Sequence, residues 1–129
     1  MSYKPEDLEK LGAPCIKAVA GLADFWSLTD EEQAQILKTD VHTLESWRAR
    51  VDAGESVELD IDMIMRVGAM LGIFRSLMTL FRADELSVGW LRTSSSSLLF
   101  NGRTAIDMMT SDNEHDLFDV YRYLKAQVS

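Results

Sequence analysis

The sequence has few cysteine, histidine or glycine residues at the spacings from which catalytic, metal or cofactor sites are built. Cys15 is the single cysteine, so no internal disulfide can form, and a reducing cytoplasm is the expected location. Its apolar neighbours indicate a small core residue rather than a nucleophile. The two histidines, His42 and His115, lie far apart without a second ligand at metal-binding spacing. We therefore predict no metal site.

The chain also lacks a glycine loop for phosphate and a basic charge balance. Gly68 and Gly72 lie four residues apart within a predicted helix, a spacing typical of helix packing rather than of a phosphate loop. We predict no cofactor, no catalytic residues and no enzymatic activity. Thirteen basic residues against 21 acidic ones give a net charge of −8, which argues against unaided binding to nucleic acid or anionic membranes.

Neither a secretion signal nor a membrane span is predicted. The start, MSYKPEDLEK, has no apolar region after its lysines. The longest apolar run, Ile61 to Phe81, contains Arg66 and Arg75, and charges at mid-span are costly in lipid. We expect this run to be a buried core helix, with no membrane partner.

Helical patterns dominate the remainder, and no stretch alternates with period two, so the predicted fold class is all-α. At 129 residues with 47% hydrophobic content, the chain is one domain or two helical pieces that share a core. Expected helix starts are Pro14 in a first turn, a Thr29–Glu32 capping box, and caps at Asp40, Asp60, Asp84, Thr104 and Ser111. The only extended segment is predicted between Thr93 and Arg103, where four serines disfavour helix.

The stretch ILKTDVHTLESWRAR, Ile36 to Arg50, has the pattern of a helix-turn-helix. The candidate DNA-binding residues are His42, Thr43 and Ser46 as base readers, with Arg48 and Arg50 as phosphate contacts. From residue 24 to residue 53 seven acidic residues face three basic ones, a local charge of −4. Since affinity for DNA rests on phosphate neutralisation, we predict weak operator binding that needs a dimer or a larger complex. Two packed helices without a DNA role are the alternative.

The C-terminal part contains an ordered series of motifs: WLRTSSSSLLFNGRTAIDMM, then DLFDVYRYLKAQ. It resembles the toxin-binding domain of Xre/MbcA/ParS-like antitoxins at Trp90, Phe100–Arg103, Ala105–Asp107 and Arg122–Leu124. Upstream, LTDEEQAQILKTDVHTLESWR and MLGIFRSLMTLF resemble the Xre-type half and the central helix of that family. The resemblance covers Ala18 to Gln127. Lys38-Thr39-Asp40 at the turn and the serines after Trp90 depart from the family pattern.

The resemblance implies a helix-turn-helix region over 1–57 and a toxin-binding domain over 58–129. It implies an antitoxin that binds a RES-domain toxin, an enzyme that consumes NAD, with homodimerisation and repression of its own operon. Two alternatives remain. One is a DNA-binding repressor as the main role. The other is an immunity protein against a delivered NAD-degrading effector.

The candidate toxin-binding residues follow the motifs of this series: Asn101, Gly102, Arg103, Asp107, Arg122, Tyr123 and Lys125. Arg103 can bind a carboxylate or phosphate bidentately, or simply pair with Asp107. Helical periodicity puts Tyr121 in the core, whereas Arg122 and Lys125 are expected to be exposed. The nearby acids Asp112, Glu114, Asp116 and Asp119 are expected to form a solvated face that assists association with a basic rim.

Overall fold

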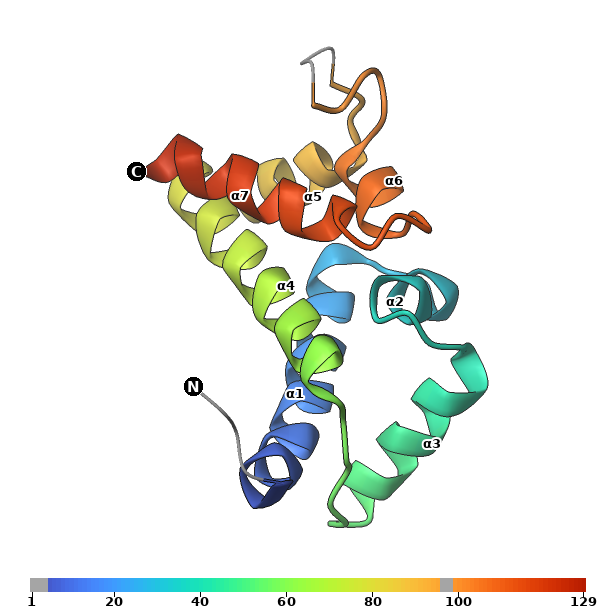
Figure 1. The fold of residues 1–129 in the computed structure, drawn as a ribbon. Coiled ribbons are helices and arrows are strands. Elements are labelled where there is room, and N and C mark those ends of the chain that lie inside the picture. The colour runs from blue at the N-terminus through green and yellow to red at the C-terminus, as the bar shows by residue number, and fades with distance from the viewer. Residues whose placement is uncertain (1–4, 96–98) are drawn as a thin grey trace.

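The computed structural model describes residues 5–95 and 99–129, and within these ranges the chain is all-helical, as predicted. The helices are α1 (Pro5–Trp26), α2 (Asp30–Ile36), α3 (Val41–Asp52), α4 (Ile61–Leu80), α5 (Asp84–Arg92), α6 (Ala105–Met109) and α7 (Asp116–Val128). In Figure 1, α4 runs diagonally through the molecule, with α1 beside its first half and α7 crossing its second half. α2 and α3 lie on the side of α1, whereas α5 and α6 lie beside α7.

α4 is the central helix of the core. Its side chains Val67, Met70, Ile73 and Leu77 are at most 1% exposed and belong to one apolar cluster with residues of α1 and α7. Among the described helices it is the one long and apolar enough to cross a membrane by length and composition. Its buried face nevertheless packs against protein, which is the arrangement that the sequence predicts for a core helix.

Four of the predicted helix caps are confirmed. The Thr29 hydroxyl accepts the backbone N–H of Glu32 at 3.0 Å, and the Glu32 carboxylate accepts that of Thr29 at 2.9 Å. Asp40 and Asp60 each accept a backbone N–H three residues later, at 2.7 and 2.8 Å. Thr104 forms a second capping box. These bonds satisfy N–H groups that a helix start otherwise leaves unpaired.

Three predicted helix starts are wrong. Pro14 lies inside α1, because Pro5 takes the first helical position and the helix continues through the later proline. α5 has Ala83 as its N-cap without a side-chain hydrogen bond, and Asp84 is already helical. α7 begins at Asp116 rather than after Ser111, because the Ser111 hydroxyl donates to the Asp116 carboxylate at 2.7 Å instead of capping a helix.

The non-helical segment from Thr93 to Arg103 is present in its described residues, but it is not the only one. Glu55–Asp60 is also non-helical and connects α3 to α4. In it Val57 and Leu59 are buried while Glu58 is exposed. This alternation with period two spans only two apolar residues, which is too short for a sequence pattern to predict an extended segment. It packs the connection against Ile16 of α1 in a second apolar cluster.

Candidate protein-interaction surface

The loop between α5 and α6 closes on itself through backbone hydrogen bonds. The Ser95 N–H donates to the carbonyl of Arg103 at 3.2 Å, and the Gly102 N–H donates to the carbonyl of Ser95 at 2.8 Å. Asn101 and Gly102 have φ values of 50° and 84°, the left-handed backbone that Asn and Gly adopt most readily in tight turns. The loop therefore exposes Asn101, Gly102 and Arg103. Of its serine run, Ser96 and Ser97 lie outside the described residues.

An aromatic cluster holds the base of this loop. Phe100 is 1% exposed and meets Tyr123 of α7 edge to face at 5.1 Å and Trp90 of α5 at 5.8 Å between ring centroids. Tyr123 and Trp90 stack at 6.4 Å. Such pairs contribute about 0.5–1.5 kcal/mol beyond the area that they bury. Tyr123 is therefore a half-buried support for the loop, with only part of its ring available to a partner.

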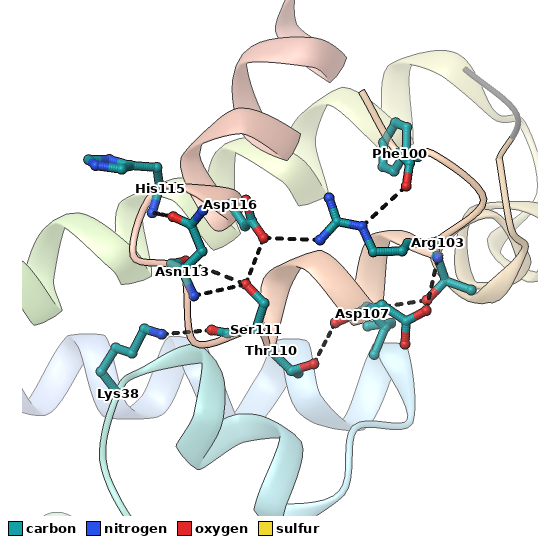
Figure 2. Close-up of polar contacts among 11 residues, drawn as sticks. Lys38, Phe100, Arg103, Asp107, Thr110, Ser111, Asn113, His115 and Asp116 are labelled. Carbon is teal, nitrogen blue, oxygen red and sulfur yellow. Dashed lines mark hydrogen bonds and ion pairs between the residues drawn. The ribbon is translucent and has the colours of Figure 1, made fainter. Parts of the chain in front are cut away.

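Arg103 is held by a chain of polar contacts that Figure 2 shows. Its guanidinium pairs with the Asp116 carboxylate at 3.3 Å and donates to the Phe100 carbonyl at 3.2 Å. The alternative of a pairing with Asp107 is wrong, because that carboxylate caps α6 through the Thr104 N–H at 3.0 Å. Asp116 was expected on a solvated face, yet it is 7% exposed. Burial is tolerable because Arg103 and the Ser111 hydroxyl both donate to it.

Two basic residues connect the end of α2 to the segment before α7. Lys38 donates to the carbonyl of Ser111 at 2.6 Å, at the end of the chain of contacts drawn in Figure 2. Arg66 of α4 is 1% exposed and donates to the carbonyls of Ile36 and Glu114 at 2.5 and 3.3 Å. Desolvation by burial lowers the pKa of Arg66 from its usual range. The α2 end is thus attached by polar bonds to the C-terminal half of the chain.

The candidate residues on α7 lie on different sides of that helix. Tyr123 faces α5 and the loop. Lys125 lies over the ring of Tyr121 at 5.7 Å, and that ring packs on Gly72 of α4. Arg122 is exposed and pairs with Asp119 at 2.6 Å.

The structure therefore brings Asn101, Gly102, Arg103 and Tyr123 together and sets Lys125 apart. Asp107 is exposed beside the loop, at the start of α6. Tyr121, expected in the core, is half-buried.

The candidate DNA-binding residues lie on α3, which packs its buried Leu44 into the main core. His42, Ser46 and Arg50 are exposed, and Thr43 is half-buried. Arg48 pairs with Asp30 of α2 at 3.1 Å and also hydrogen-bonds Gln33. Of the two candidate phosphate contacts, Arg50 has no hydrogen bond or ion pair through its side chain to the described residues, whereas Arg48 is engaged.

Two ion pairs, Arg103–Asp116 and Glu32–Arg92, were not predicted from the sequence. In the first pair, Asp116 was expected among solvated acids, and no local pattern distinguishes it from its acidic neighbours. Glu32 of α2 pairs with Arg92 of α5 at 3.0 Å, and the hydrogen bond from Arg92 lowers the pKa of the Glu32 carboxyl. Its partner is 60 residues away. Neither pair has a sequence signal, because helix packing alone selects the partners.

The chain is similar to a known bacterial protein over most of its length. No protein-family model matches the chain. The chain is 29% identical over 113 residues to an uncharacterized protein, y4oB, of Sinorhizobium fredii (strain NBRC 101917 / NGR234). The match spans 87% of this chain and 82% of that protein.

Proposed function

We propose that this chain is a non-enzymatic antitoxin that acts in the cytoplasm and neutralises a RES-type, NAD-consuming toxin. The proposal is carried by the ordered series from Trp90 to Leu124 and its resemblance to the toxin-binding domain of Xre/MbcA/ParS-like antitoxins. A further observation supports this series. Trp90, Phe100 and Tyr123, which are separate in sequence, contact one another beneath the exposed Asn101–Arg103 turn. A rigid base under an exposed turn is suited to binding a protein partner.

Two observations on the described residues bear on metal and thiol chemistry. Among them, no group of three histidine, cysteine or acidic side chains is arranged to hold a metal ion. Burial raises the pKa of the Cys15 thiol, which disfavours the thiolate that nucleophilic chemistry needs. The proposed toxin-binding domain covers 58–129, and the proposed Xre-like helix-turn-helix region covers 1–57.

The proposal is tested with the product of the neighbouring gene. The antitoxin should copurify with it, and addition of the antitoxin should stop its consumption of NAD. The double change Arg122→Glu and Lys125→Glu should release that inhibition, because reversing two charges at a complementary interface costs several kcal/mol, on the order of 2–5. Both side chains are exposed, so the free energy of unfolding should change little.

The matched control is the double change Lys17→Glu and Arg50→Glu. These side chains are also exposed and carry the same charges, but they lie on α1 and α3. The control should inhibit like the parent. Full inhibition by a folded Arg122→Glu, Lys125→Glu protein would exclude these two residues from the inhibitory surface. The antitoxin proposal itself would be contradicted if the neighbouring protein neither bound this chain nor consumed NAD.

Operon repression is the second candidate function, and the exposed His42, Ser46 and Arg50 on α3 favour it. Binding is expected to need a homodimer or a toxin complex, because the region is acidic. Arg50→Ala should weaken DNA binding at all sequences and reduce the slope of log affinity against log salt by about one. Arg48→Ala should have a smaller effect on that slope, since Arg48 already pairs with Asp30. Equal effects of the two changes in a filter-binding assay would contradict this distinction.

A further inference from the structure

A groove of about 310 Å³ lies between the second halves of α4 and α7. Figure 1 shows these two helices meeting near the C-terminus. The residues that line it include Gly72, Arg75, Ser76, Thr79, Tyr121 and Lys125. A Cβ atom at Gly72 would lie 2.2 Å from the Tyr121 ring, so the glycine is what allows that ring to form one wall. The volume is within the range of small-molecule sites, about 300–1,000 Å³.

The charge in this groove is opposite to that of the whole protein. Arg75 and Lys125 are both exposed, and neither forms an ion pair with the described residues. No acidic side chain is among the described residues that line it, although the chain has 21 acids. Four other arginines, by contrast, each pair with a carboxylate. The groove therefore holds two positive charges that the described part of the chain leaves unneutralised.

Hydroxyl groups complete the lining. Ser76 is only 5% exposed, lines the groove, and makes no side-chain hydrogen bond to a described residue. Tyr121 is half-buried, and its phenol likewise has no hydrogen-bond partner in the described ranges. Together with the two cations, these hydroxyls supply hydrogen-bond donors to the lining of the groove.

We propose that this groove binds the phosphate group of a small phosphorylated ligand. A phosphate monoester carries a charge of about −1.5 to −2 at pH 7 and offers three acceptor oxygens. Arg75 and Lys125 match that charge, whereas a single carboxylate would neutralise only one of them. Ser76 and Tyr121 can donate to the remaining oxygens. The proposal does not depend on the antitoxin function, since Arg75 and Ser76 are not among the candidate toxin contacts. Lys125 is the one groove residue that is also a candidate toxin contact, so the phosphate test uses variants of Arg75 and Ser76.

The test is a titration of the full-length protein with inorganic phosphate, glycerol phosphate and acetate at constant ionic strength. Binding is monitored through the amide chemical shifts. Both phosphates should bind saturably and shift the amides of Ser76 and Tyr121, and acetate should bind more weakly. Arg75→Gln and Ser76→Ala should each weaken phosphate binding, the former by about tenfold or more because it removes a charge-assisted bond.

Arg82→Gln is the matched control, because Arg82 is exposed and unpaired in the described ranges but does not line the groove. It should leave the affinity for phosphate unchanged. Circular dichroism of each variant establishes that it is folded. Shifts that do not saturate, acetate binding as tight as phosphate, or equal losses in Arg82→Gln and Arg75→Gln would each overturn the proposal.

Discussion

Gly12 and Gly21 lie in the same helix, α1, and replacing each with alanine should change stability in opposite directions. A Cβ atom at Gly12 would lie 1.6 Å from the carbonyl oxygen of Val57. At Gly21 an added Cβ meets nothing within 4 Å. The contact at Gly12 is with backbone, which cannot rotate away as a long side chain can. The alanine at this position therefore has to push α1 away from the connection between α3 and α4.

The magnitude follows from what that separation loosens. Ile16, Val57 and Leu59 form the second apolar cluster and are 3%, 1% and 2% exposed. Full burial of such a side chain contributes about 1.5–3 kcal/mol, and overpacking typically costs about 1–3 kcal/mol. Alanine recovers about 1 kcal/mol of helix propensity. The expected net loss for Gly12→Ala is about 2 kcal/mol, whereas Gly21→Ala should gain about 0.5–1 kcal/mol.

Thermal and urea denaturation followed by circular dichroism measure both changes. In a domain of this size 1 kcal/mol corresponds to a shift in Tm of about 4 °C. Gly12→Ala should therefore lower the Tm by about 8 °C, and Gly21→Ala should raise it by a few degrees. A rise in Tm for both variants would refute the close packing of α1 on Val57, and with it the physical attachment of α1 to the α3–α4 connection.

Two further predictions concern the polar bonds that join separate helices. Arg92→Gln should destabilise the protein near neutral pH, where ionised Glu32 accepts from Arg92. Because the folded-state pKa of Glu32 is lowered, this stabilisation is present above the unfolded-state pKa and lost as pH falls through the folded value. The difference in unfolding free energy between parent and variant should thus shrink on acidification, and a constant difference would contradict the assignment. Arg66→Met should cost about 2–4 kcal/mol in urea denaturation, because it leaves the carbonyls of Ile36 and Glu114 without their donor. A loss below about 0.5 kcal/mol would show that water replaces the guanidinium there.

The limits of several helices can be predicted from the sequence because their determinants are local. Thr29, Asp40, Asp60 and Thr104 each bond a backbone N–H three residues away. A cap of this kind needs only its own turn of chain, so its residue pattern is sufficient evidence. The prediction failed at Ser111, where a side-chain contact five residues away took the place of the helix cap. Its hydroxyl bonds Asp116, which in turn holds Arg103.

The apolar character of α4 also identified the core helix from sequence, because hydrophobic burial depends on composition and periodicity rather than on a particular partner. The choice of hydrogen-bond and ion-pair partners within the chain is different. The pairs Glu32–Arg92, Lys38–Ser111 and Arg66–Ile36 join residues that are 30 to 73 positions apart. A surface arginine can reach any acceptor that packing brings within about 3 Å, and many acceptors in the sequence are equivalent. Only the relative placement of the helices selects one of them, and that placement is set by how the apolar faces of α1, α4 and α7 fit together.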